Sequence, residues 1–254
     1  MIRILVNGSN GKMGQEVINL ILKSKDFYLY GGLDTYKKDN MNYITYCSTD
    51  EFINLPDVII DFSVPEASLS ISKYASQKSI PIVIATTGFS KNEEDLIIEL
   101  SKKTAIFKSA NMSFDINVMK NTVANLSTIL SSDDIEIIET HHNSKLDSPS
   151  GTAIMLADSI NRKSGNKYTY IFNRCDRREK RSNNEIGFSS IRGGNIVGEH
   201  SVIFFSDDES LEVKHIAYSR SVYAKGALKA AKFIVNKDSG YYTMNDLIVS
   251  ENVS

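Results

Sequence analysis

The chain has few cysteines and no long apolar run, and both shortages limit the classes of protein to which it can belong. Its 254 residues contain two cysteines, Cys47 and Cys175, which stand far apart in the sequence. A disulfide framework or a thiolate metal site needs paired cysteines, so we expect neither, and a reducing compartment fits best. No apolar run approaches the about 20 residues that span a bilayer, and the strand pattern at the N-terminus argues against a targeting peptide. We therefore expect a cytoplasmic protein with no membrane contact.

An excess of charge of one sign is also lacking. The formal net charge is -2, so nothing in the composition favours binding to nucleic acid or to an anionic membrane. Hydrophobic residues make up 41% and charged residues 24% of the chain, which is typical of a globular protein with a sizeable core. The length allows one large domain or two modest ones.

Strand and helix patterns alternate through the first part of the chain. Apolar runs rich in β-branched residues predict strands at 2–6, 27–33, 57–63, 80–88 and 105–111. Apolar residues at three- and four-residue spacing predict helices between these strands, one of which begins at Pro65. Near-continuous apolar strands separated by helices are typical of a parallel sheet covered on both faces. The first part is therefore predicted to be a Rossmann-like, doubly wound α/β domain.

The second part has a different pattern. A long amphipathic helix at 116–130 and a strand at 134–140 come first. Three closely spaced strands follow later, at 187–192, 200–206 and 210–219. Strands joined by short turns indicate an antiparallel or mixed sheet, so we predict a second, α+β domain with an open mixed sheet.

The last helical pattern, at 221–237, can return to cover the first sheet. We therefore assign 1–111 and 220–254 to a dinucleotide-binding domain, and 112–219 to a substrate-binding and oligomerisation domain. The polar run at 174–184 is interpreted as a mobile, solvated loop, with a binding loop as the alternative.

The stretch VNGSNGKMG, residues 6–14, is similar to a dinucleotide-binding fingerprint but departs from it at one position. Gly8 can make the tight turn after the first strand, Gly11 opens the helix, and Gly14 lets the helix pack closely on the strand. Asn10 stands where a second glycine is usual, although asparagine tolerates positive φ better than most residues. Replacing Asn10 by glycine is expected to lower the Kd of the cofactor or to leave it unchanged. A purely structural glycine-rich turn is the alternative.

An acidic residue supports the nucleotide-binding interpretation. Asp34 lies 20 residues beyond Gly14, at the end of the second predicted strand, where a carboxylate can bond a ribose diol. A turn-forming aspartate is the alternative. An acid here favours NADH because it repels the 2′-phosphate of NADPH, whereas Lys12, Lys37 and Lys38 can accept that phosphate. We expect both cofactors to bind, with NADH at least as good.

The densest group of chemically active residues is ETHHNSKLDSPSGTA, at 139–153, in which two histidines are adjacent. A histidine can donate a proton near neutral pH. Lys145 adds a positive charge, and a helix start with Ser148 or Ser150 as its cap offers N–H groups to a carboxylate. The stretch therefore predicts a site for a small dianionic substrate.

Three alternatives apply to this stretch. Adjacent histidines on a strand face opposite sides, so one of them can be a packed or surface residue. A zinc site needs three or four convergent ligands and only a histidine pair is visible, so no metal is expected. The segment SPSGT can be an ordinary capped turn. A cation, two imidazoles and an anion-binding turn within so few residues favour a functional site.

The same stretch closely resembles the dihydrodipicolinate reductases, also called 4-hydroxy-tetrahydrodipicolinate reductases, of the diaminopimelate route to lysine. Their hallmark E-x-H-H-x-x-K-x-D-x-P-S-G-T-A matches 139–153 at every fixed position. The likeness continues through NGSNGKMG, DFSVPEA, ATTGF, SANMSFDINV, IGFSSIRGGNIVGEH and SRSVYAKGA, and covers essentially the whole chain. The chain departs from the family pattern at Asn10, Ala85 and Met112, positions that bear on cofactor preference and affinity.

The resemblance implies a reductase that uses NADH, NADPH or both. It makes His141 the proton donor and acceptor, and Lys145 a second proton donor that also holds a substrate carboxylate. The substrate-binding residues that it implies are His142, Lys145, Ser150, Gly151 and Thr152. The cofactor-binding residues that it implies are Gly8, Ser9, Asn10, Gly11, Lys12, Met13, Asp34, Ala85, Thr86, Thr87, Ser109, Ala110, Asn111 and Met112. Members of the family are typically tetramers assembled through the sheet of the second domain, so a homotetramer is expected.

The expected reaction is reduction of dihydrodipicolinate to tetrahydrodipicolinate, with a small dicarboxylate as the substrate and no nucleic acid as a partner. An amino- or keto-acid dehydrogenase with the same two-domain plan is one alternative, although the cluster at 139–153 fits a rigid dicarboxylate better. A non-catalytic dinucleotide sensor is another, and it needs the glycine turn but neither His141 nor Lys145.

Overall fold

The chain folds into two compact units. The computed structural model describes residues 1–38, 41–175 and 177–251. The first unit comprises Met1–Phe114 and the C-terminal stretch from Arg220 onward, and the second unit is Asp115–Ser219. The first unit is therefore assembled from two stretches that are separated by more than a hundred residues of sequence.

The first unit contains a seven-stranded sheet in the order β12-β6-β5-β4-β1-β2-β3, in which every pair of neighbours is parallel. The strands are β1 (Ile2–Asn7), β2 (Phe27–Leu33), β3 (Thr45–Tyr46), β4 (Val58–Asp61), β5 (Ile82–Ile84), β6 (Ala105–Lys108) and β12 (Gly240–Tyr242). The chain runs outward from β1 to β3 on one side and from β4 to β12 on the other. This is the doubly wound, Rossmann-like arrangement, so the predicted fold of the first part is confirmed.

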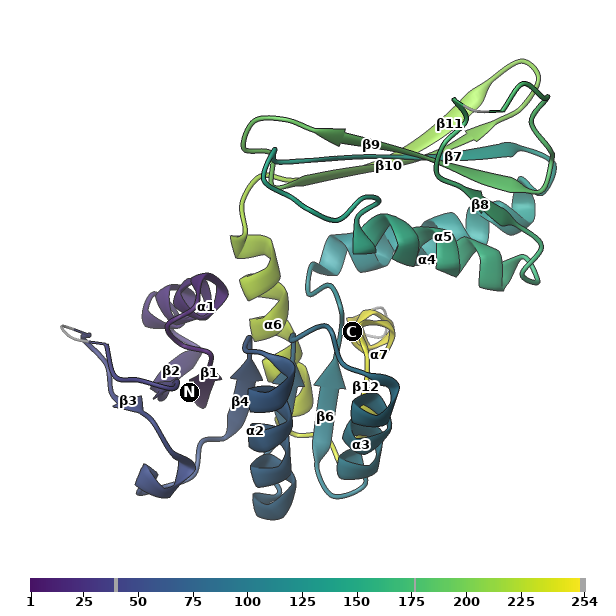
Figure 1. Cartoon of the computed structure of the whole chain (residues 1–254). Coiled ribbons are helices and arrows are strands. Elements are labelled where there is room, and N and C mark those ends of the chain that lie inside the picture. Colours follow the sequence, from purple (N-terminus) through teal and green to yellow (C-terminus); the bar gives the residue numbers. More distant parts are fainter. Residues whose placement is uncertain (39–40, 176, 252–254) are drawn as a thin grey trace. The chain divides into compact units, whose positions relative to one another are not determined.

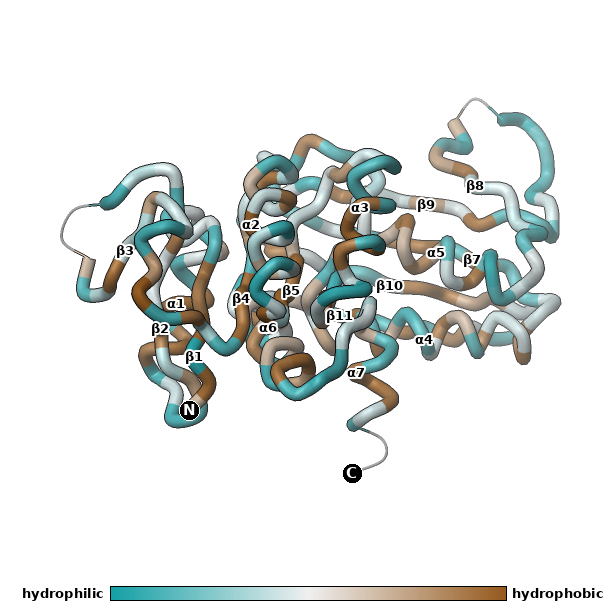
Figure 2. Tube along the Cα trace, turned by 90° about the horizontal axis from the view of Figure 1, so that it is seen from below, coloured by the Kyte–Doolittle hydropathy of each residue, from teal (hydrophilic) through white to brown (hydrophobic). Residues whose placement is uncertain are grey.

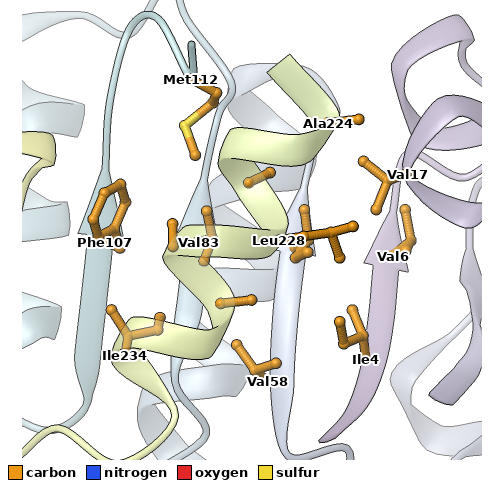
Figure 3. Packing of buried hydrophobic residues seen from close by; sticks show 14 of the residues in the cluster. Ile4, Val6, Val17, Val58, Val83, Phe107, Met112, Ala224, Leu228 and Ile234 are labelled. Carbon is orange, nitrogen blue, oxygen red and sulfur yellow. The ribbon is translucent and has the colours of Figure 1, made fainter. Parts of the chain in front are cut away.

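Helices cover both faces of this sheet. They are α1 (Lys12–Leu22), α2 (Pro65–Lys78), α3 (Lys91–Ser101), α6 (Ser221–Ile234) and α7 (Met244–Glu251), with a short 3-10 helix, η1 (Thr49–Glu51). Helices α1 and α6 share one core with the strands, and α2 and α3 share the other. In Figure 3, Leu228 and Ile234 of α6 lie against Val58 and Val83 of the strands. Helix α6 thus returns to the first sheet, as predicted.

The sequence explains this burial. The central strands carry apolar, buried residues on both sides of the sheet, whereas the covering helices mix hydrophobic and hydrophilic residues (Figure 2). Helix α3 begins with a capping box, in which Ser90 accepts from the backbone of Glu93 and the Glu93 side chain accepts from the backbone of Ser90. This cap sets where α3 begins, and hence where the loop that follows β5 at the carboxyl edge of the sheet ends.

The second unit contains a five-stranded mixed sheet in the order β11-β10-β7-β9-β8. Its strands are β7 (Asp134–His141), β8 (Thr169–Ile171), β9 (Glu185–Arg192), β10 (Gly198–Phe205) and β11 (Ser210–Ala217). Strand β9 runs parallel to β7 and β8, whereas β10 is antiparallel to β7 and β11. Helices α4 (Phe114–Ile129) and α5 (Gly151–Lys163) pack on one face of this sheet (Figure 1). The predicted α+β fold with a mixed sheet is confirmed.

Most described residues of the polar segment 174–184 are exposed, as its composition suggested, but three of its arginines are bonded to the second sheet. Arg174 donates to Glu136 at 2.7 Å, and Arg181 donates to the backbone carbonyls of Ile135 at 2.9 Å and Glu185 at 2.8 Å. Acidic side chains at this end of β7 and β9 attract the arginines, and the loop is tied to the sheet. Position 176 of this segment lies outside the described residues. In the part of the chain that the structure describes, no helix has the length and apolar character needed to cross a bilayer.

Candidate functional site

The turn between β1 and α1 has the backbone shape that the glycine pattern predicts. Gly8 has a φ of +77°, and a Cβ placed there would lie 2.5 Å from the carbonyl oxygen of Phe62. A Cβ at Gly14 would lie 2.2 Å from the carbonyl oxygen of Gly8. Both positions therefore require glycine, the first for a left-handed turn and the second for close helix–strand packing.

Helix α1 starts at this turn with Gly11 as its N-cap, and no side chain caps it. The N–H groups of a first helical turn have no partner inside the helix and carry the positive end of the helix dipole. A glycine cap leaves room for a ligand to approach them. The turn therefore fits the pyrophosphate of a dinucleotide, which binds at a helix N-terminus without intervening side chains.

A cavity of about 740 Å³ opens beside this turn. It is lined by the turn, by the end of β2 and by the segments that precede η1 and begin α2: Asn7, Gly8, Asn10, Gly11, Leu33, Asp34, Thr35, Tyr36, Cys47, Ser48, Thr49, Phe62, Ser63, Val64, Ala67, Ser70 and Ile71. Four of the predicted cofactor-binding residues, Gly8, Asn10, Gly11 and Asp34, thus share one cavity. Its mixed apolar and polar lining suits an adenosine group.

Asn10 connects the turn to the end of β2 by two hydrogen bonds. Its backbone N–H donates to Asp34 Oδ2 at 2.7 Å, and its side-chain Nδ2 donates to the carbonyl of Tyr36 at 2.9 Å. The other carboxylate oxygen of Asp34 accepts from the N–H of Thr35 at 2.8 Å. The Asp34 carboxylate is therefore held in a fixed position at the cavity, and the side-chain contact of Asn10 was not anticipated from the sequence.

Other predicted cofactor residues lie outside this cavity. Ser9 is fully buried and its side chain lies where a Cβ of Gly32 would be, whereas Lys12 and Met13 begin α1 without lining the cavity. The remaining positions follow β5 and β6, whose carboxyl ends lie at the same edge of the sheet as those of β1 and β4: Ala85, Thr86, Thr87, Ser109, Ala110, Asn111 and Met112. This edge is where open α/β sheets bind ligands.

Two of these side chains are engaged within the protein. Thr86 donates to Asp61 Oδ2 at 2.8 Å, and the buried Met112 packs in the core of the first unit (Figure 3). Asp61 is fully buried and also accepts from Asn7 at 2.7 Å and Ser63 at 2.6 Å. Burial raises the pKa of Asp61 above its usual value, and these donors oppose the rise. This network joins the ends of β1, β4 and β5.

Lys37, one of the candidate phosphate ligands, is already paired. Its Nζ lies 2.6 Å from Glu51 Oε2, and Glu51 Oε1 accepts from the backbone N–H groups of Cys47 and Ser48. The hydrogen bond from Lys37 lowers the pKa of Glu51, which is ionised at neutral pH. Lys37 is therefore drawn toward η1 and its charge is partly neutralised.

The second group of predicted site residues lies at the end of β7. Residues of β7 alternate between half-buried and buried, and Glu139 and His141 both point to the face that α4 and α5 cover. The His141 Nδ1 atom lies 2.6 Å from Glu139 Oε2. Burial lowers the pKa of His141, while the hydrogen bond and charge of Glu139 act in the opposite direction.

Helix α5 begins beside this pair. Ser150 is its N-cap and accepts from the N–H of Ala153 at 3.2 Å, while its own N–H donates to Glu139 Oε1 at 3.1 Å. The Ser150 hydroxyl is buried and also bonds His200 Nε2 at 3.0 Å, so it supports the helix start rather than facing solvent. Gly151 and Thr152 form the first positions of the helix.

Lys145 is paired with Asp147 at this helix start. Lys145 Nζ lies 2.7 Å from Asp147 Oδ1. The hydrogen bond from Lys145, with a smaller contribution from the Gly151 N–H, keeps the pKa of Asp147 below its usual value. A carboxylate thus already lies between Lys145 and the N-terminus of α5, as predicted for a substrate carboxylate. His142 lies just beyond the strand, with Nδ1 2.8 Å from the Ser144 hydroxyl.

Sequence reasoning assigned no role to three residues of this site. Arg192 forms two hydrogen bonds with Glu139, at 2.7 and 2.8 Å, and the ring of His200 lies 5.1 Å from that of His141. Burial lowers the pKa of His200 to about 3, so its ring is neutral. Glu139 could have been found, because it lies two positions before His141 on a strand and so shares its face. The strand register places His200 beside Glu139 and Arg192 beside His141, and a single sequence does not reveal this register.

Among the described residues, no three histidine, cysteine or acidic side chains converge as metal ligands.

The glycine turn, the uncapped helix and Asp34 together fit a dinucleotide. A dinucleotide-binding turn on a doubly wound sheet, in a chain that also carries a histidine–lysine site in its second unit, is typical of an NAD(P)H-dependent oxidoreductase. Two family models then match nearly the whole chain: dihydrodipicolinate reductase, N-terminus, over residues 2–112, and dihydrodipicolinate reductase, C-terminus, over residues 115–248. The chain belongs to the dihydrodipicolinate reductase family, and the resemblance is confirmed.

Named members of this family align with the chain over nearly their full lengths. A 4-hydroxy-tetrahydrodipicolinate reductase from Caldanaerobacter subterraneus subsp. tengcongensis is 45% identical over 250 residues, which covers 98% of both chains. The enzyme of the same name from Clostridium tetani is 45% identical over 251 residues, again covering 98% of each. A dipicolinate-bound dihydrodipicolinate reductase from Paenisporosarcina sp. TG-14 has the same fold, with a TM-score of 0.80 and 22% identity over 96% of this chain and 97% of that one.

Proposed function

We propose that this protein reduces dihydrodipicolinate, which 4-hydroxy-tetrahydrodipicolinate gives by loss of water, to tetrahydrodipicolinate in the diaminopimelate route to lysine, with His141 and Lys145 as the reacting side chains. The observation that carries the assignment of residues is the buried His141–Glu139 pair beside Lys145 and the start of α5. Membership of the family and relatives of the same name over the full length support the reaction.

The first unit binds the cofactor through the glycine turn and Asp34. The bound nicotinamide supplies the hydride. In the second unit, Lys145 and the N-terminus of α5 bind a substrate carboxylate, with Gly151 and Thr152 as the backbone donors and His142 close by. A substrate carboxylate replaces that of Asp147, which is exposed and therefore held only weakly by Lys145.

His141 moves the proton through Nε2. In the free protein the lowered pKa of His141 leaves most rings neutral at pH 7. A bound dianionic substrate favours the charged form, because opposite charges stabilise each other at short range. The imidazolium then donates its Nε2 proton as negative charge develops on the substrate. Lys145 assists by neutralising charge at the carboxylate.

The proposal extends to cofactor preference, assembly and location. With Lys37 paired to Glu51 and a fixed carboxylate at Asp34, NADH binds at least as well as NADPH. The uncovered face of the second sheet, which carries the partly exposed Ile191, Phe205 and Ile216, supports a homotetramer assembled through this sheet. Two exposed free cysteines suit the reducing cytoplasm.

The test is oxidation of NADH in the presence of freshly made synthase product. His141→Gln is expected to lower kcat by about 10²-fold, as for loss of a general acid. Lys145→Ala is expected to raise KM as well, because it removes a substrate contact. His215→Gln, a histidine of β11 outside the proposed site, is the matched control and should retain activity. Full activity in His141→Gln would overturn its role, activity only with amino or keto acids would favour a different dehydrogenase, and cofactor binding without oxidation would favour a sensor.

A further inference from the structure

Glu139 is a buried and fully bonded side chain of the second unit, yet its carboxylate has no part in the roles described above. It is 1% exposed and accepts from Arg192, His141, Ser150 and Ser190. Arg192 contributes two hydrogen bonds at 2.7 and 2.8 Å, His141 Nδ1 lies at 2.6 Å, and the N–H of Ser150 lies at 3.1 Å. Burial alone would raise the pKa of Glu139, but the hydrogen bonds from Arg192, Ser190 and His141 lower it to about 2.

An ionised carboxylate only accepts hydrogen bonds, and this determines the tautomer of His141. The short contact to Glu139 requires a proton on His141 Nδ1. The proton that His141 gains and loses is therefore the one on Nε2. A Cβ on Gly198 would lie 3.0 Å from that Nε2 atom, so the glycine keeps the space around it open.

The same carboxylate also holds the start of α5. One oxygen, Oε1, accepts from the Ser150 N–H and from Arg192, while Oε2 faces His141 and accepts from the second arm of the guanidinium. The proton donor and the helix end that binds the substrate carboxylate are thus attached to one rigid group. Buried ion pairs contribute little stability compared with apolar residues of similar size, so packing alone does not account for this arrangement.

We propose that Glu139, held by Arg192, is a positioning residue for the reaction: it fixes His141 with Nδ1 protonated and Nε2 facing the substrate, and it raises the affinity of His141 for the transferred proton. This inference rests on the role proposed for His141. It assigns to Glu139 and Arg192 a function in proton transfer that requires no contact with the substrate.

The test compares Glu139→Gln with Glu136→Gln. Glu136 lies on the same strand and is also paired with an arginine, Arg174, but it points to the opposite face. In Glu139→Gln the amide can donate to His141 Nδ1, which favours the wrong tautomer, and the unbalanced charge of Arg192 disfavours the imidazolium. We expect kcat to fall by about 10²-fold with KM changed by less than about threefold. Glu136→Gln should leave both parameters unchanged.

A second readout does not depend on turnover. Exchange of the imidazole C2 proton, followed by mass spectrometry of the His141 peptide, reports the titration of this ring in the free protein. Loss of an adjacent carboxylate removes a stabilising partner of the imidazolium, so the His141 midpoint should fall by about 1–2 pH units in Glu139→Gln. It should not move in Glu136→Gln. The alkaline limb of the kcat profile should move to lower pH in the same variant, because the reaction needs the protonated ring.

A double variant keeps the test decisive if Glu139→Gln folds poorly. Glu139→Gln/Arg192→Gln removes both charges together, so no unpaired charge stays buried. Its His141 midpoint and kcat should stay below those of the unaltered protein, with only partial recovery because the charge of Arg192 is gone. Full recovery of either one would show that Glu139 only neutralises Arg192, and an unchanged midpoint in Glu139→Gln would overturn the inference. Failure of the proposed function has a different signature, namely full activity in His141→Gln.

Discussion

Asn10 joins the glycine turn to the segment after β2 through its backbone and its side chain. The backbone bond to Asp34 survives any substitution, whereas the bond from Nδ2 to the Tyr36 carbonyl depends on the amide. Both Asp34 and Tyr36 line the cavity assigned to the cofactor. The side chain of Asn10 therefore helps to order this wall of the cavity, which the proposed function assigns to the ribose.

Asn10→Gly is accordingly expected to weaken NADH binding, which reverses the sign expected from the sequence. Loss of one hydrogen bond, worth about 0.5–1.5 kcal/mol, and greater backbone freedom together raise the Kd by about 2- to 10-fold. Fluorescence titration of NADH measures the effect. Asn10→Ala is the matched variant, since it removes the same bond without adding a glycine. Equal or tighter binding in both variants would contradict the role given to the Asn10 side chain.

Among single residues, the sequence predicts those whose position only one or two residue types can occupy. Gly8, Gly14 and Asp34 were predicted from spacing, and the structure gives each a geometric reason. Arg192 was not predicted, because it meets Glu139 through a register between strands that lie 53 residues apart. Ser148 and Ser150 were both candidates for the cap of α5; Ser150 is the cap, and its buried hydroxyl is turned toward His200.

At the scale of elements, the segment from β2 to η1 determines which charges surround the ribose. Lys37 follows the cavity residues Thr35 and Tyr36, and its ion pair with Glu51 ties it to η1. Both side chains are partly exposed, so the pair is weak. The repulsion from Asp34 is therefore the larger obstacle to NADPH, and Lys37–Glu51 adds a smaller one.

Glu51→Gln is expected to improve NADPH binding without changing the affinity for NADH. Releasing Lys37 and removing one negative charge lowers the Kd of NADPH by about two- to fivefold, which corresponds to the energy of an exposed ion pair. Titration of both cofactors measures the ratio. Asp50→Asn, an acid of the same turn that is not bonded to Lys37, is the control. The assignment is contradicted if the Asp50 and Glu51 variants change the ratio equally, or if adding Lys37→Ala does not abolish the gain.

The elements that the sequence predicts are those with a clear apolar period. Strand β2 was predicted at its observed bounds, and α6 was predicted to return to the first sheet. The short strands β3, β8 and β12 were missed, since two or three residues at the edge of a sheet have no period of their own. The segment 174–184 is mostly exposed, as predicted, but its arginines meet acidic partners on β7 and β9 that composition does not reveal.

At the scale of the whole molecule, the two units divide the chemistry. The first unit, which the chain leaves after Phe114 and re-enters at Arg220, carries the dinucleotide cradle. The second unit carries the ionised Glu139, the imidazole that it orients and the lysine at the start of α5.

The proposed function requires that hydride is transferred from the nicotinamide to the dicarboxylate substrate on this protein. The most direct measurement uses NADH deuterated at C4 in each of its two configurations, with freshly made synthase product as the substrate, and mass spectrometry of the product. One of the two labelled cofactors should transfer one deuterium to each molecule of tetrahydrodipicolinate, and the other should transfer none. Product without deuterium from either cofactor, or cofactor oxidation without this product, would contradict the claim.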